Sequence, residues 1–152
     1  MGLATMVIEW TDQLSVGNET IDSEHRGLIS LVNDLVRAIE KRSSSGLALA
    51  FEQLEQRLCL HFANEKEIAR TIGLDFSHHE LAQQYMLNEL RFLKGLLDAK
   101  NCLWFDGAVA HFAHFLKNWM IDDHIVRLDM QIKPALQTHP YGFKNDETPA
   151  HG

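Results

Sequence analysis

Residues that can bind metal ions recur along this chain at helical spacing, each in the middle of a stripe of apolar residues. Histidines and carboxylates are costly to bury in an apolar core unless they are paired, hydrogen-bonded or bound to a cation. Several helices that each direct such a side chain at one interior point are typical of a helical bundle built around a metal centre. The residues that form this pattern are His25, His61, Glu65, His79, His124 and Asp129.

Four segments carry the period of an amphipathic helix, with apolar residues three and four positions apart. The first two are expected over residues 20–40 and 47–72, the third from Asp75 or Ser77 to about 97, and the fourth over 106–133. Turns are expected at 43–46 and 100–101, and Pro134 should end the fourth helix because proline cannot donate a backbone hydrogen bond.

Short turns between long helices predict an all-α fold, an up-down-up-down antiparallel four-helix bundle. No strand pattern or internal repeat interrupts the helical segments. We expect an N-terminal arm over residues 1–18, the bundle over 19–136, and a C-terminal tail over 137–152.

The charge balance excludes several kinds of partner. The net charge is −7, from 14 basic and 21 acidic residues, so nucleic acid and anionic membrane surfaces are poor partners. No apolar segment approaches the roughly 20 residues that a membrane span requires. Cys59 and Cys102 lack the Cys-x-x-Cys spacing and are expected to be reduced thiols. With no cationic leader at Met1, a cytoplasmic protein is expected.

His61 and Glu65 stand four residues apart, so their side chains project from the same surface of one helix. A bound metal would resolve the cost of burying both, because it needs deprotonated ligands and supplies compensating charge. Mixed imidazole and carboxylate ligands suit iron, manganese or zinc. The set is larger than one tetrahedral zinc would use, which favours two metal ions bridged by Glu65 and Asp129.

The spacing of His124 and Asp129 does not fit an ideal α-helix. Five residues correspond to about 140° around such a helix. Either the carboxylate reaches around the helix, or the helix is wound differently at this point.

These residues also match a known family, and the chain resembles the bacterial hemerythrins from Trp10 to about Leu136. The matching motifs are Trp10…Leu14-x-Val16-Gly17…Ile21-Asp22-x-x-His25…Leu28, His61-Phe62-x-x-Glu65, His79, and Trp119-x4-His124-Ile125-x3-Asp129. The resemblance implies a non-haem site with two iron ions, joined by an oxo or hydroxo bridge and by Glu65 and Asp129. It implies that the iron held by His25 and His61 has an open position for O₂ or another small diatomic or anionic ligand. The other iron would take two histidines from the third helix and one from the fourth.

Gln83 departs from this pattern, because the family has a second histidine four residues after the first in the third helix. The register with His79 and Gln83 inward also buries Met86, whereas a register using Glu80 and Gln84 would bury Asn88. One hypothesis is that the second iron keeps only His79 and His124 as nitrogen ligands, with water or the Gln83 amide at its remaining position. The alternative is that Gln83 binds iron or a bound solvent and leaves O₂ binding unaltered.

We expect a di-iron O₂-binding protein that carries, stores or delivers oxygen, with an unknown protein partner. A sensor of O₂ or nitric oxide and an enzyme acting on peroxide or nitric oxide remain alternatives, and Gln83 favours the enzyme. Gln83 breaks the zinc-protease motif His-Glu-x-x-His, and the chain lacks the paired Glu-x-x-His motifs of ferritin-like oxidases. Asp22 is a candidate acceptor for a ligating imidazole or has an N-cap or first-turn role.

Overall fold

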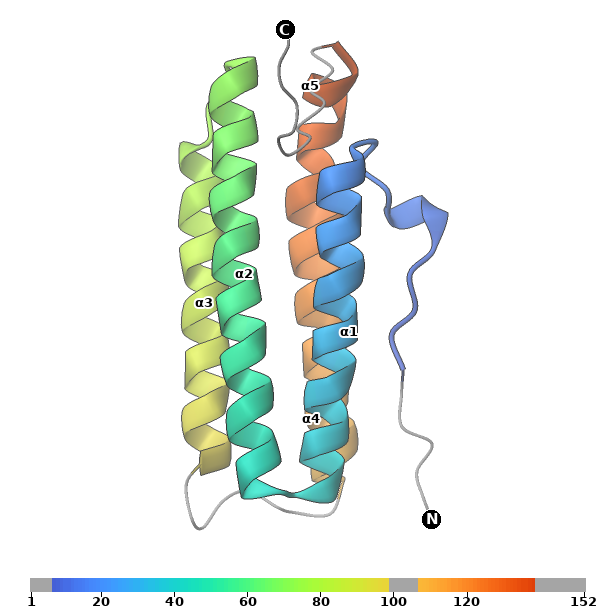
Figure 1. Cartoon of the computed structure of the whole chain (residues 1–152), viewed down its shortest axis with the longest axis vertical. Helices are drawn as coiled ribbons and strands as arrows, with labels where there is room; N and C mark the ends of the chain where they lie inside the picture. The colour runs from blue at the N-terminus through green and yellow to red at the C-terminus, as the bar shows by residue number, and fades with distance from the viewer. Residues whose placement is uncertain (1–6, 99–106, 139–152) are drawn as a thin grey trace, which may run out of the picture.

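Four long helical stretches lie side by side in the computed structural model, which describes residues 7–98 and 107–138 (Figure 1). All regular secondary structure in these ranges is helical, which confirms the predicted all-α helical bundle. In Figure 1 the colour gradient runs downward along α1 and α3 and upward along α2 and α4. The elements are η1 (Asp12–Leu14), α1 (Glu19–Lys41), α2 (Ser44–Ile72), α3 (Ser77–Asp98), α4 (Ala108–Lys117), η2 (Asn118–Leu128), η3 (Asp129–Ile132) and α5 (Lys133–Thr138).

The first two helices begin and end with local capping interactions. The side chains of Asn18 and Ser43 accept hydrogen bonds from the third backbone amide after each, and so satisfy amides of the first turn. Gly73 ends α2 in the left-handed conformation, at φ 74°, where glycine has no steric penalty. The predicted turn at 43–46 is wrong in extent, because α2 already begins at Ser44 with Ser43 as its cap.

The fourth helical stretch changes its winding along its length. It starts as the α-helix α4, continues as the π-helix η2 and tightens into the 3₁₀ segment η3 before α5. The prediction that Pro134 ends this stretch is wrong, since Pro134 is the second residue of α5. Proline is tolerated there because amides of the first turn need no partner within the helix.

A layer of polar residues divides the core into two apolar clusters. The larger cluster fills the bundle between the layer and the α1–α2 turn, and includes Leu28, Leu54, Leu58, Met86 and Ile125. The smaller cluster lies on the other side of the layer, with its buried members Val16, Ile21, Ile68, Ala69, Phe76, Ile132 and Leu136. The layer itself consists of His25, His61, Glu65, His79, Gln83, His124 and Asp129, all buried.

The segment before α1 packs against the bundle. The backbone of Ile8 donates to and accepts from the Asn33 side chain at 2.9 Å in each case. Asp22 accepts hydrogen bonds from the Ser15 hydroxyl and the Val16 amide, and it lies in the first turn of α1, which confirms the predicted first-turn role and not that of an acceptor for a ligating imidazole. Its carboxylate instead ties this segment to the first turn of α1.

None of the helices in the described ranges combines the length and apolar character of a membrane span. The predicted turn at 100–101, Cys102 and the residues from 139 onward lie outside the described residues.

Candidate metal centre

Five buried side chains from three of the four helical stretches converge on one point. Their ligand atoms all lie within 4.8 Å of one another. They are His25 from α1, His61 and Glu65 from α2, His124 from η2 and Asp129 from η3. These are the residues that the sequence pattern singled out on those helices.

The π-helix explains the spacing of His124 and Asp129. A π-helix forms hydrogen bonds between residues five apart, so side chains five positions apart come close to the same face. The His124 Nε2 atom lies 2.8 Å from the Asp129 Oδ2 atom. Of the two explanations left open by the sequence, local rewinding of the helix is therefore confirmed.

The Asp129 carboxylate presents its two oxygens to different groups of imidazoles. Its Oδ2 atom lies 2.6 Å from His25 Nε2, 2.8 Å from His124 Nε2 and 3.3 Å from His61 Nε2. Its Oδ1 atom lies 2.9 Å from His79 Nε2. Asp129 thus separates a three-imidazole side, formed by His25, His61 and His124, from a side formed by α3.

The two carboxylate oxygens of Glu65 also face different sides of the cluster. Its Oε2 atom lies 3.1 Å from His61 Nε2, on the three-imidazole side. Its Oε1 atom accepts a hydrogen bond of 2.8 Å from the Gln83 amide and lies 4.0 Å from His79 Nε2. Both carboxylates therefore face the three-imidazole side with one oxygen and the α3 side with the other.

The α3 side has the predicted register. His79 and Gln83 are buried, whereas His78, Gln84 and Asn88 are exposed. The alternative register, which would bury Asn88, is excluded. The resemblance implied that the histidine of the fourth helix joins that of the third, but the structure groups His124 with His25 and His61.

The remaining histidines on the fourth helical stretch lie outside the cluster. His111 and His114 are exposed. Trp119 is buried in the larger apolar cluster and donates from its indole nitrogen to the Met86 carbonyl at 3.3 Å, so it is part of the packed core.

The short contacts among the ring nitrogens of this cluster cannot all be hydrogen bonds. His124 Nε2 lies 3.1 Å from His61 Nε2 and 3.2 Å from His25 Nε2, as well as beside Asp129. One ring nitrogen carries at most one hydrogen, so His124 cannot donate to all three neighbours. Among the described residues, Glu65 Oε2 is one of three buried side-chain atoms without a hydrogen-bond partner. A cation between these atoms would satisfy both features, so the donor set fits a metal.

The electrostatics of the cluster lead to the same conclusion. Burial lowers the pKa of His25 to about 4 and also lowers the pKa of His124. Burial opposes charge on His61 as well, but Glu65 and Asp129 outweigh it and raise the pKa of His61 well above its ordinary value. Burial, followed by repulsion from Asp129, raises the pKa of Glu65. A divalent cation would replace the protons that such a cluster otherwise has to hold.

Glu24 is a functional candidate that the sequence analysis missed. Its carboxylate accepts a hydrogen bond of 2.6 Å from His61 Nδ1, and Asn64 donates to its other oxygen. This bond fixes the His61 ring with Nε2 toward the cluster, as carboxylate partners of metal-binding histidines do. Adjacency to His25 was the available signal, but a contact between α1 and α2 cannot be read from one sequence.

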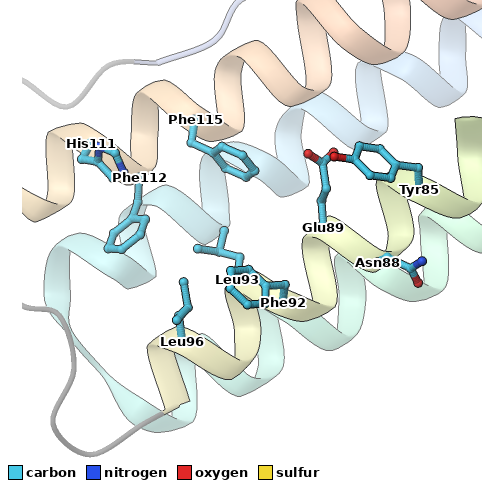
Figure 2. A pocket seen from close by; sticks show the side chains of 9 residues that line it. All are labelled: Tyr85, Asn88, Glu89, Phe92, Leu93, Leu96, His111, Phe112 and Phe115. Atoms are coloured by element: carbon cyan, nitrogen blue, oxygen red, sulfur yellow. The ribbon is translucent and has the colours of Figure 1, made fainter.

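A surface groove between α3 and α4 is separate from the cluster (Figure 2). It has a volume of about 500 Å³, and Figure 2 shows Phe92 and Leu93 of α3 facing Phe112 and Phe115 of α4. None of its lining residues belongs to the polar layer. The metal-binding chemistry is therefore inside the bundle and away from this groove.

Comparison with known proteins relates the chain to hemerythrins. No protein-family model matches it. It is 30% identical over 77 residues to a bacteriohemerythrin of Pseudomonas aeruginosa, covering 47% of this chain and 50% of the relative. It is 25% identical over 128 residues to a hemerythrin-like protein of Naegleria gruberi, covering 84% of this chain and 92% of the relative. A bacteriohemerythrin of Stenotrophomonas maltophilia is 27% identical over 70 residues, 46% of each chain.

The chain spans about half the length of the bacterial relatives that it matches. These relatives support a hemerythrin-like family for this chain. Together with the buried cluster of histidines and carboxylates, they support a metal site, with iron as the metal.

Proposed function

We propose that this chain is a di-iron O₂-binding protein, whose role is the carriage, storage or delivery of oxygen in the cytoplasm. Two iron ions would be held by His25, His61, His79, His124, Glu65 and Asp129, with Gln83 beside them. The fold that carries them would be an up-down-up-down bundle over residues 19–136, with an arm over 1–18 and a tail over 137–152.

This proposal rests on one observation, which is that each of the two carboxylates directs one oxygen to each side of the cluster. Asp129 Oδ1 faces His79 while its Oδ2 faces the three-imidazole side, and Glu65 is divided between Gln83 and His61. A carboxylate that offers one oxygen to each of two neighbouring groups is suited to bridging two cations. Bound ferrous ions would supply the electrons that reversible O₂ binding requires.

Buried apolar side chains lie beside the cluster. Leu28, Ile29, Leu58 and Phe62 are buried around the three-imidazole side, and the Phe62 ring stacks on His124 with 5.5 Å between ring centroids. An apolar lining limits solvent access and lowers the local dielectric at such a site. These residues would thereby protect a reduced centre from hydrolysis and uncontrolled oxidation.

Metal analysis with an absorption spectrum tests the proposal. Metal-free protein is loaded with ferrous salt under argon, freed of unbound iron and then exposed to air. We expect about two irons per chain from the division of the carboxylates, a new visible absorption band in air, and loss of that band when oxygen is removed. Retention of no iron, or a spectrum unchanged by oxygen, would contradict it.

Gln83 favours peroxide chemistry as a second candidate function. It donates to Glu65, and His79 is the imidazole that α3 directs at the centre. A position without its second imidazole would be open to a small oxidant. Consumption of hydrogen peroxide with an added electron donor would support this function, and Gln83→His should slow it. Identical spectra and oxygen-decay rates in the parent and Gln83→His would remove it.

A further inference from the structure

We infer that the two metal positions of this chain are unequal, so that the three-imidazole side fills first and the His79–Gln83 side takes its ion weakly. This inference rests on the proposed function, since it assigns different affinities to the two halves of the same centre.

The three-imidazole side brings together the denser donor set. The ligand atoms of His25, His61, His124, Glu65 and Asp129 lie within 4.8 Å of one another. Three of the five are imidazole nitrogens and two are carboxylate oxygens, a set that suits a transition metal.

Preorganisation adds to this advantage. The 2.6 Å hydrogen bond from His61 Nδ1 to Glu24 holds that ring with Nε2 directed at the cluster. Glu24 is itself held by Asn64. Carboxylate partners of this kind raise metal affinity by about 10–100-fold.

The α3 side offers fewer donors. His79 Nε2 is 2.9 Å from Asp129 Oδ1, and the second side chain on this face, Gln83, supplies an amide. An amide oxygen is a neutral and weaker metal donor than an imidazole nitrogen.

Gln83 is also oriented for another interaction. Its nitrogen donates to Glu65 Oε1 at 2.8 Å, with the side chain 4% exposed. An amide nitrogen has no lone pair available for a metal, so Gln83 would have to turn its oxygen inward and lose this bond. The bond therefore uses one of the two bridging carboxylates and opposes binding of a second ion.

Equilibrium dialysis of metal-free protein against buffered ferrous ion under argon tests the inference, with bound iron per chain as the readout. In the parent we expect two steps, the second at a free ferrous concentration at least about tenfold above the first. Gln83→His should bring the second step down toward the first and leave the first in place. Gln84→His, an exposed change one residue along α3, is the matched control and should alter neither step.

The assignment of each step to a side is tested by two further variants. His79→Ala should remove the weaker step and spare the tighter one, whereas His25→Ala should weaken the tighter step. Uptake of both ions in a single step by the parent would overturn the inference, whether or not Gln83→His folds. So would loss of the tighter step in His79→Ala.

The readout also separates this inference from the function on which it rests. Two unequal steps in a protein whose spectrum does not respond to oxygen would support unequal positions while contradicting O₂ binding. Retention of no iron by the parent would defeat both.

Discussion

The larger apolar cluster and the polar layer are successive layers of the same four helical stretches, and they fill the interior in opposite ways. Leu54 and Leu58 are fully buried and belong to a cluster of buried apolar side chains. In the adjoining layer, which begins one turn after Leu58, His61, Glu65 and Asp129 occupy equally buried positions with groups that hold protons or charge. The first layer gains free energy from burial alone, whereas the second gains it only when its charges are compensated.

The comparison shows how the chain divides stability and function. The two apolar clusters lie on either side of the polar layer, so the bundle can fold around a layer that contributes little by itself. Changes in the polar layer should therefore alter metal binding more than the stability of the metal-free protein. Changes in the apolar clusters should do the reverse.

Loss of the metal should lower the free energy of unfolding more than any of the other changes described below. An ion that binds only the folded state contributes about 4.1 kcal/mol to the free energy of unfolding at a free concentration about 1,000-fold above its Kd. Asp129→Ala should abolish this gain, because Asp129 contacts His25, His61, His79 and His124.

Urea unfolding of parent and Asp129→Ala, each with and without ferrous ion under argon, measures this gain. The difference between the loaded and metal-free forms is compared within each protein, which removes any effect of Asp129→Ala on the metal-free fold. Identical unfolding of the parent with and without iron would show that the polar layer is not stabilised by the metal.

Leu54→Ala tests the apolar layer. Leu54 is fully buried in the larger cluster, and the cavity left by its side chain should cost about 3 kcal/mol of unfolding free energy. The loss should be the same in metal-free and metal-loaded protein, because Leu54 contacts no residue of the centre through hydrogen bonds or ion pairs. Urea unfolding of both forms measures it.

Leu60→Ala is the matched control on the same helix. Leu60 is 57% exposed, so its truncation should change the unfolding free energy by less than about 0.5 kcal/mol. A metal affinity that fell with Leu54→Ala would show that the two layers are coupled and not independent.

Glu24→Ala tests the edge of the polar layer. Loss of the hydrogen bond to His61 should weaken ferrous binding by about 10–100-fold, or about 2 kcal/mol. Competition with a chelator of known affinity measures the change. Glu24→Gln keeps an oxygen acceptor for His61 Nδ1 and should restore part of the affinity. Glu19→Ala, an exposed change on the same helix, should leave it unaltered.

The helices and their buried faces could be predicted because periodicity reports burial directly. His25, His61, Glu65, His79 and Gln83 stand at positions that share a face with the apolar residues of their helices. The same rule fails where the backbone departs from an α-helix. It could not place Asp129 beside His124 without the π-helix, and it ended the fourth stretch at a proline that lies in the first turn of another helix.

Contacts between helices were the other limit. Asp22 and Glu24 are two residues apart on α1, and their spacing along the chain does not tell which of them serves an imidazole. The structure directs Asp22 to the segment before α1 and Glu24 to His61 on α2. Their roles depend on which neighbouring element each side chain faces, and periodicity within one helix does not contain that information.

Ser43→Ala should give the smallest effect, at the end of the bundle away from the polar layer. The Ser43 side chain accepts a hydrogen bond of 3.1 Å from the Gly46 amide and satisfies the first turn of α2. Its removal should cost about 1 kcal/mol of unfolding free energy, measured by urea unfolding, and leave ferrous affinity unchanged. Ser45→Ala, an exposed change within that first turn, is the control and should cost less. Because α2 carries both Ser43 at its start and His61 and Glu65 in its second half, a fall in metal affinity in Ser43→Ala would mean that fraying of α2 reaches the centre. The polar layer would then depend on the full length of its helix, and not only on the packed layers beside it.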